Sequence, residues 1–227
     1  MIHFNAHNIQ KKWPNVDLSF SCKIEKGSML GIVGHSGSGK STVLRLISGL
    51  LPLDSKDCSI MLGENDITRL HPSKRNIGMV FQTPCLFNHM KVVDNVAYGL
   101  ISRGMYKKEA RKQAINFLAQ FELEGFEKRW PDTLSGGEAQ RVSLARTLIT
   151  KPELVLFDEP FSALDAPLRK KLAQDIKQLQ KNLGFTGIMV THDIAEAQNL
   201  CDIVTVMQHG VQVWTGNAKE FEEGKLR

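Results

Sequence analysis

Cysteine is scarce in this sequence, and the features of an exported chain are missing. The four cysteines, Cys22, Cys58, Cys85 and Cys201, stand far apart, and no CxxC pair occurs. This spacing suggests neither a zinc knuckle nor a disulfide framework. The first residues have neither a basic start nor an apolar core, so we expect no signal peptide. These absences favour a reduced, cytosolic type of chain.

Long hydrophobic runs are also lacking. The best runs are short, such as Leu154–Phe157, whereas a membrane span needs roughly 18 apolar residues. Apolar residues make up 42% of the chain and charged residues 23%, which excludes a disordered or collagen-like protein. At about 150 residues per domain, 227 residues predict one large domain or one domain with a subdomain.

The net charge is positive, +5 from 29 basic and 24 acidic residues. Nucleic acid, an anionic membrane surface and phosphorylated ligands would all suit this sign. The basic residues do not form one block, however, and those between 103 and 112 lie among acids and alanines. We therefore interpret most of them as parts of solvated helix faces.

Apolar runs and glycine breaks predict alternating strands and helices. Strands are expected at 29–33, 60–62, 77–81, 154–157, 187–190, 203–207 and 211–214. Helical spacing appears at 43–47, 110–121 and 168–183, the last with Pro167 in its first turn and Gly184 as its stop. The alternation predicts an α/β fold with a mainly parallel sheet, interrupted by a mainly helical insertion at 84–150.

A glycine-rich loop between the first of these strands and its helix matches the GxxxxGK[ST] phosphate-binding pattern. Glycine lets backbone N–H groups approach phosphate oxygens, and the helix directs its positive end at the same anion. Lys40 supplies a charge for the β- and γ-phosphates, and the Ser41 hydroxyl is a candidate Mg²⁺ ligand. A flexible turn rich in glycine is the alternative, but the flanking strand and helix disfavour it. The predicted loop comprises Gly34, His35, Ser36, Gly37, Ser38, Gly39, Lys40, Ser41 and Thr42.

Two carboxylates follow the apolar run Leu154–Phe157, at the end of a strand where α/β proteins bind their ligands. We predict that Asp158 holds Mg²⁺ and that Glu159 is the general base that activates water. Neighbouring residues of a strand point to opposite faces, which favours two separate roles. A solvated acidic turn is the alternative interpretation.

A second glycine-containing turn, Leu134-Ser135-Gly136-Gly137, precedes another apolar helix. One chain needs only one phosphate cradle for one ATP, so a second one makes sense if it serves a nucleotide held by another copy. The order and spacing of the motifs resemble the ATP-binding cassette (ABC) transporter ATPases. The motifs are the phosphate loop and residues 81–82, 134–137, 157–160, 162–165 and 191–193.

The resemblance implies a P-loop NTPase fold, with a core at 1–83 and 151–227, an N-terminal antiparallel β part, an inserted helical subdomain at 84–150 and no C-terminal regulatory domain. It implies ATP and Mg²⁺ as ligands. It also implies roles for single residues: Gln82 near Mg²⁺ and water, Ser135, Gly136 and Gly137 against the nucleotide of the opposite copy, Asp165 across the dimer interface, His192 at the γ-phosphate, and Trp13 stacked on adenine. Two departures are Glu138, where glutamine is common, and the longer loop 53–59.

Residues 75–82, 86–89 and 94–100 resemble the importer branch of this family, and the short chain slightly favours a thiamine-type member. The implied partners are a second cassette, as a homodimer or a paired ATPase, integral membrane permease subunits and, indirectly, an extracytoplasmic solute-binding protein. The implied location is the cytoplasmic face of the membrane, with no nucleic acid expected. Three alternatives stay open: a soluble ABC ATPase acting on nucleic acid or ribosomes, an exporter or remodelling subunit, and a nucleotide-gated subunit with negligible hydrolysis. Five apolar residues of this region have two interpretations, a docking groove for the membrane subunits or the core of the subdomain: Leu86, Phe87, Met90, Val92 and Val93.

Overall fold

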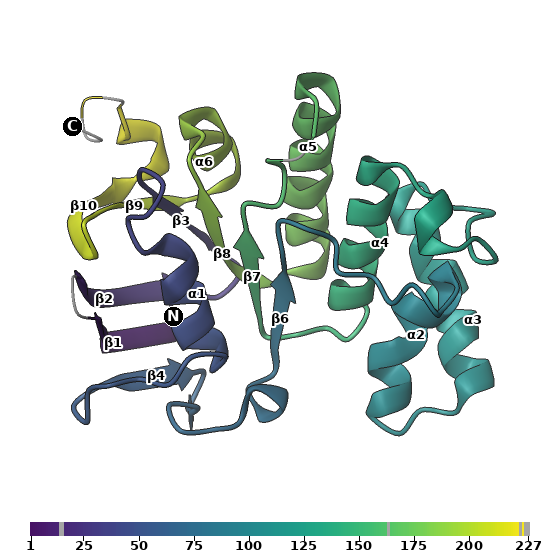
Figure 1. Cartoon of the computed structure of the whole chain (residues 1–227), viewed down its shortest axis with the longest axis horizontal. Coiled ribbons are helices and arrows are strands. Elements are labelled where there is room, and N and C mark those ends of the chain that lie inside the picture. The colour runs from purple at the N-terminus through teal and green to yellow at the C-terminus, as the bar shows by residue number, and fades with distance from the viewer. Residues whose placement is uncertain (14–15, 163, 223, 225–227) are drawn as a thin grey trace. The chain divides into compact units, whose positions relative to one another are not determined.

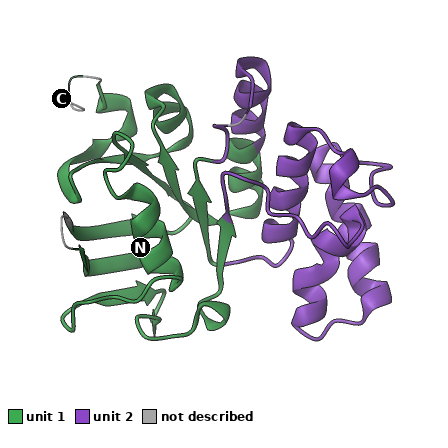
Figure 2. Cartoon of the chain, viewed as in Figure 1, with its two compact units in different colours: residues 1–79, 153–159, 176–227 green, residues 80–152, 160–175 purple. Residues whose placement is uncertain are grey.

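The computed structural model describes residues 1–13, 16–162, 164–222 and 224, with the backbone alone at Val16 (Figure 1). Two compact units are present, and Figure 2 colours them separately. The first contains residues 1–79, 153–159 and 176–227, and the second contains residues 80–152 and 160–175. The predicted division into a core and an insertion at 84–150 stays a prediction, since the helical unit also takes in residues 160–175.

One sheet of the first unit is antiparallel. In the described residues its strand order is β2-β1-β4-β5, from β1 (Ile2–Trp13), β2 (Val16–Glu25), β4 (Ser59–Leu62) and β5 (Asn65–Asp66). Phe4, Ala6 and Ile9 of β1 turn one buried face towards the core. The longer loop 53–59 is attached to this sheet, because Asp54 accepts hydrogen bonds from the Lys11 side chain and the Lys12 amide at 2.7 and 2.8 Å.

The other sheet has a parallel core. Its described order is β10-β9-β3-β8-β7-β6, in which β3 lies parallel to β8 and β9, β7 lies parallel to β8, and β10 is antiparallel to β9. The strands β3, β7 and β8 are buried at every residue, as parallel strands covered on both faces are. The bounds are β3 (Met29–Val33), β6 (Ile77–Val80), β7 (Leu154–Asp158), β8 (Thr186–Thr191), β9 (Ile203–Gln208) and β10 (Val211–Asn217).

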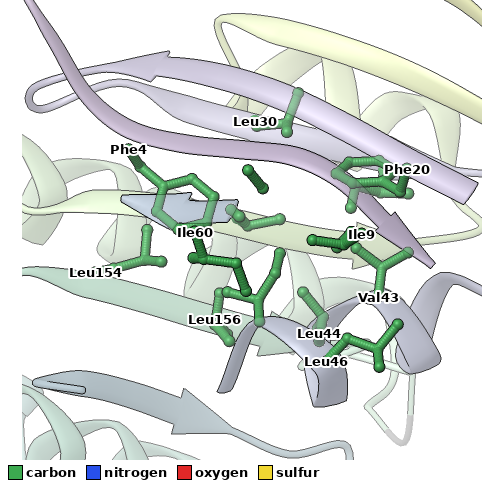
Figure 3. Packing of buried hydrophobic residues seen from close by; sticks show 14 of the residues in the cluster. Phe4, Ile9, Phe20, Leu30, Val43, Leu44, Leu46, Ile60, Leu154 and Leu156 are labelled. Carbon is green, nitrogen blue, oxygen red and sulfur yellow. The ribbon is translucent and has the colours of Figure 1, made fainter. Parts of the chain in front are cut away.

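Helix α1 (Lys40–Ser48) shares one hydrophobic core with both sheets. Figure 3 shows side chains of β1, β2, β4, α1, β3 and β7 gathered in this cluster. The helix ends at Gly49, whose φ of 80° is the left-handed conformation that glycine adopts easily. The guanidinium of Arg75 then donates to the last carbonyls of the helix, those of Leu46 and Ile47, at 3.3 and 2.7 Å. The C-terminal end of α1 is therefore fixed by a residue outside the helix.

The remaining elements of the first unit are short. Helix α6 (Ile194–Leu200) begins at Asp193, whose side chain accepts from the Glu196 amide at 3.1 Å. Single helical turns occur at Pro72–Lys74 and Ala218–Glu220. The four cysteines are free thiols, and burial raises the pKa of the Cys201 thiol to about 12.

The second unit is helical. It contains α2 (Val92–Ser102), α3 (Lys107–Leu118) and α4 (Gly136–Leu148), with helical turns at Ala119–Phe121 and Pro131–Thr133. Asp94 of α2 and Arg111 of α3 form a bidentate ion pair at 2.7 and 2.8 Å. Helix α5 (Ala166–Leu183) begins among the residues of this unit and ends among those of the first. In the described part of the chain, no helix is long and apolar enough to cross a membrane.

The apolar residues predicted as a docking groove or core divide between the two. Val92 and Val93 are buried and belong to the core of the second unit. Leu86, Phe87 and Met90 are half-buried, so part of each stays accessible.

Candidate active site

The glycine-rich loop connects β3 to α1, as the sequence pattern predicts. A Cβ atom on Gly34 would collide with the Met207 carbonyl oxygen, so only glycine fits where the loop leaves the strand. Gly39 stands at the start of α1 with a φ of 100°, and no side chain caps this end of the helix. The first amides of α1 are therefore available to an anion.

Lys40 is buried at the centre of this loop. Its side chain is 5% exposed, and its Nζ donates to the carbonyls of Gly34 and His35 at 2.8 and 3.0 Å. Burial lowers the pKa of Lys40, although the nearby carboxylates of Glu159 and Asp158 oppose the shift. The Ser38 hydroxyl is buried and has no hydrogen-bond partner in the described residues. A phosphate oxygen would satisfy both groups, so the loop fits the triphosphate of a nucleotide.

Ser41 and Asp158 meet at the end of β7. The Ser41 hydroxyl donates to Asp158 Oδ1 at 2.7 Å, and Asp158 is buried at 8% exposure. A hydroxyl and a carboxylate are hard oxygen donors of the kind that Mg²⁺ takes next to phosphate groups. These residues therefore fit the predicted ion.

Glu159 has a different partner from its neighbour. Its Oε2 lies 3.2 Å from Nδ1 of His192, which follows β8, and its amide donates to the Val190 carbonyl at 3.1 Å. The φ of Glu159 is 45°, a conformation that costs energy for a residue with a side chain and that concentrates at functional sites. The strained backbone turns this carboxylate towards the histidine while Asp158 faces the serine.

A hollow of about 330 Å³ adjoins the outer side of the phosphate loop. Four loop residues, His35, Ser36, Gly37 and Ser38, line it together with residues 207–209 at the end of β9. His35 and Ser36 are exposed, in contrast to the buried Ser38 and Lys40.

The second glycine-containing turn begins α4 in the helical unit. Ser135 Oγ accepts from the Glu138 amide at 3.4 Å, and Glu138 Oε2 accepts from the Ser135 amide at 2.7 Å. This reciprocal capping box lowers the pKa of Glu138, and a glutamine, which is common at this position in the resembling family, could cap the helix in the same way. Gly136 is exposed, whereas a Cβ on Gly137 would collide with the Leu168 side chain.

Comparison with known proteins decides the family. A model of the ABC transporter family matches residues 18–162, more than half of the chain. The chain belongs to the ABC transporter family. It is an ATP-binding domain of the ABC type, as the resemblance of its motifs predicts.

Two similar proteins illustrate its place in this ABC family. The Fe(3+) ions import ATP-binding protein FbpC 1 of Rhizobium meliloti (strain 1021) is 45% identical over 208 residues, which cover 91% of this chain and 58% of the relative. FbpC of Brucella abortus (strain 2308) is 42% identical over 219 residues, 95% of this chain and 61% of the relative. The chain thus spans about three fifths of the length of the curated relatives it matches.

Two solved ABC structures share the fold. CbiO1 of Clostridium perfringens, part of the ABC transporter complex CbiONQ, is 28% identical with a TM-score of 0.84, covering 96% of this chain and 90% of its own. The ATP-binding cassette MJ0796, dimeric in a post-hydrolysis state with ADP and Pi, is 30% identical with a TM-score of 0.83, covering 96% and 100%. The predicted α/β fold with a mainly parallel core sheet is confirmed.

The other predicted ABC site residues occupy several elements. Trp13 is the last residue of β1 and is 40% exposed, and Thr42 lies half-buried in the first turn of α1. Gln82 is exposed in the second unit, just after β6. Asp165 accepts from the Leu168 amide at 2.9 Å and so precedes α5 as a cap. Of the motif 162–165, Ala163 lies outside the described residues.

The structure therefore assembles the predicted residues of the first unit: Lys40, Ser41, Asp158, Glu159 and His192. Gln82, Ser135 and Asp165 belong to the second unit and are described within it.

The sequence did not predict the hydrogen bonds that fix the backbone on either side of His192. The Asp193 amide donates to Thr191 Oγ1 at 3.0 Å, and Thr191 Oγ1 donates to Glu196 Oε2 at 2.6 Å, inside the buried end of β8. An acidic residue followed three positions later by glutamate is typical of a helix N-terminus, and this signal in 193–196 could have found them.

Proposed function

We propose that this chain binds and hydrolyses ATP as the ATPase subunit of an ABC importer. The observation that carries the proposal is that the side chains needed for ATP binding and for water activation lie together in the first unit. Lys40 is buried in the glycine-rich loop, the Ser41 hydroxyl donates a hydrogen bond to Asp158, and Glu159 is hydrogen-bonded to His192. The FbpC relatives, which are named for import, support the importer assignment.

The residues divide the reaction between them. Backbone amides of the loop and Lys40 hold the β- and γ-phosphates, and Ser38 donates to a phosphate oxygen. Ser41, Asp158 and Gln82 would hold Mg²⁺, which would neutralise developing phosphate charge. Glu159 accepts a proton from water as the water oxygen bonds to the γ-phosphorus, and the bond to the β–γ bridging oxygen breaks to give ADP and phosphate. His192 keeps Glu159 in place and contacts the γ-phosphate.

The second turn completes the site from another copy. Ser135 and Gly136 are exposed at the start of α4 and Gly137 is buried behind them, and this helix start would meet the γ-phosphate held by the partner's phosphate loop. Asp165 would cross the same interface, and Trp13 would stack on adenine. The dimeric state of the related cassette MJ0796 supports a dimer for this chain.

The partners follow from the importer assignment. Permease subunits would contact the surface between Gln82 and Tyr106, where Leu86, Phe87 and Met90 stay half-buried. The chain would then lie peripherally at the cytoplasmic face of the membrane, and a solute-binding protein would act indirectly. The relatives are named for Fe(3+) import, which favours ferric iron over the predicted thiamine-type substrate.

The test is the variant Glu159→Gln, with Glu64→Gln, an exposed glutamate in the turn after β4, as its control. We expect Glu159→Gln to bind ATP normally, to release phosphate at least a hundredfold more slowly, and to accumulate as a dimer with ATP. Phosphate release, nucleotide binding and size-exclusion chromatography, with and without Mg²⁺, measure these effects. Near-normal phosphate release by Glu159→Gln would remove Glu159 from the role of base.

A further inference from the structure

Helix α3 carries a basic surface that contains none of the residues assigned above to the nucleotide site or to the dimer contact. The helix contains four cations and one acid, Glu109. All four cations line one shallow hollow of about 510 Å³, together with Ile115 and Asn116. We call this surface the α3 basic face, defined by Lys107, Lys108, Arg111, Lys112, Ile115 and Asn116.

Three of these cations are available to a partner. Arg111 is occupied by Asp94, which accepts from its Nε and Nη2. Lys107, Lys108 and Lys112 are exposed, and within the described residues none of them has a hydrogen bond or an ion pair. The face therefore presents three exposed ammonium groups beside an arginine that is paired with Asp94.

The fold does not need these lysines where they are. Lys107 and Lys108 lie with one acid, Glu109, in the first turn of α3, where the helix dipole disfavours positive charge, and Tyr106 gives this end no side-chain cap. Three other residues of the helix, Ala110, Ala114 and Leu118, are buried and hold it against the unit. An anion near the first turn would convert an unfavourable charge arrangement into a favourable one.

Apolar groups lie beside the charges. Tyr106, immediately before the helix, is 88% exposed, and Ile115 within the hollow is 46% exposed. Lysines next to an exposed tyrosine and an aliphatic side chain are typical of surfaces at the lipid headgroup level, where stems and rings contact acyl chains and ammonium groups contact phosphates. Nucleic acid would use the lysines but would leave the aliphatic residue without a partner.

We propose that the α3 basic face binds the headgroups of anionic phospholipids. This contact would be additional to the permease contact proposed above, and it does not depend on ATP hydrolysis. Lysines near an anionic membrane contribute about fivefold each to binding, so three of them contribute about a hundredfold.

The test is sedimentation of the purified full chain with vesicles of phosphatidylcholine, alone or mixed with phosphatidylglycerol. The test variant carries Lys107→Gln, Lys108→Gln and Lys112→Gln. The matched control carries Lys26→Gln, Lys56→Gln and Lys74→Gln, which lowers the net charge equally at three exposed lysines of the first unit. A third variant replaces the three α3 lysines by arginine.

We expect the wild type, the control and the arginine variant to bind mixed vesicles in a salt-sensitive manner, with little binding to phosphatidylcholine alone. The α3 glutamine variant should bind about a hundredfold more weakly while it keeps its thermal midpoint and its rate of phosphate release in solution. That unchanged rate separates this proposal from the proposed ATPase activity.

Several results would overturn the proposal. One is an absence of wild-type binding to mixed vesicles, and another is an equal loss in the α3 variant and its control, which would show an effect of net charge alone. A further one is a competition result. If single-stranded nucleic acid displaced the protein from the vesicles, and if its own binding required the α3 lysines, the ligand of the α3 basic face would be nucleic acid.

Discussion

Replacing Arg75 by alanine removes the group that closes the far end of the phosphate-loop helix. The guanidinium is 5% exposed and donates to four carbonyls, those of Leu46, Ile47, Thr68 and Leu70, at 3.3, 2.7, 3.0 and 2.9 Å. Each such bond to a charged donor contributes about 1.5–3 kcal/mol. Removal of the cation also removes the cost of burying it, and water can enter the space. Each buried carbonyl left without a donor costs about 1–3 kcal/mol where water does not reach it, so we expect a net loss of about 3–5 kcal/mol.

Thermal and urea unfolding, followed by circular dichroism, measure this loss. For a chain of this length, about 3–5 kcal/mol lowers the thermal midpoint by roughly 6–20 °C. The thermal midpoint of Arg75→Lys should lie between those of Arg75→Ala and the wild type. One ammonium group cannot reach all the carbonyls that the planar guanidinium contacts. Arg45→Ala, on the exposed side of the same helix, is the control and should change stability by no more than about 0.5 kcal/mol.

A midpoint for Arg75→Ala within the range of the Arg45→Ala control would refute the reasoning. It would mean that water replaces the guanidinium at all four carbonyls without loss. ATP affinity provides a second measurement, since α1 begins at Lys40 and Ser41. We expect the Arg75→Ala variant to bind ATP more weakly, whereas Arg45→Ala should bind it normally.

Two further substitutions test the loop and the helical unit. Gly34→Ala places a Cβ against the Met207 carbonyl, so the loop must shift, and ATP affinity should fall at least tenfold in a binding titration. The control Gly63→Ala meets no neighbouring atom, but its φ of 59° strains any side chain, so it should lower stability and leave ATP affinity unchanged. Arg111 lowers the pKa of Asp94 below its unfolded value, so the pair stabilises the fold above about pH 4 and this contribution disappears as the pH falls through the folded pKa. Asp94→Asn should therefore be less stable than the wild type in urea at neutral pH, and the two should converge in acid; a constant difference would contradict this linkage.

The parallel sheet was predictable because its strands are buried on both faces. Four apolar residues at 154–157 predicted β7, and the structure adds only Asp158. The N-terminal hairpin gave a weaker signal. Register shifts between Ile2 and Phe4 and between Ala6 and Ile9 interrupt the alternation of β1, so no regular two-residue period marks that strand. Family resemblance, rather than periodicity, predicted the antiparallel part.

Local spacing also predicted the phosphate loop but not the contacts between distant segments. Ser41 and Asp158 are 117 residues apart, and Glu159 and His192 are 33 residues apart. Only the order of strands in the parallel sheet brings these side chains to one edge. The left-handed backbone of Glu159 has no sequence signal, because glutamate rarely adopts it. By contrast, the Ser135–Glu138 spacing is that of a capping box, a contact that the local sequence pattern predicts.

The two adjacent carboxylates have separate supports, and this separation has a chemical consequence. Asp158 ends β7 and is fixed by the Ser41 hydroxyl, which belongs to the phosphate-binding helix. Glu159 is fixed by the Val190 carbonyl and His192, which belong to the neighbouring strand and the residue after it. A change at His192 therefore releases the proposed base without disturbing the proposed ion ligands. The proposed ion ligand and the proposed base are consequently supported by different hydrogen-bonded groups, although the two carboxylates are neighbours in the chain.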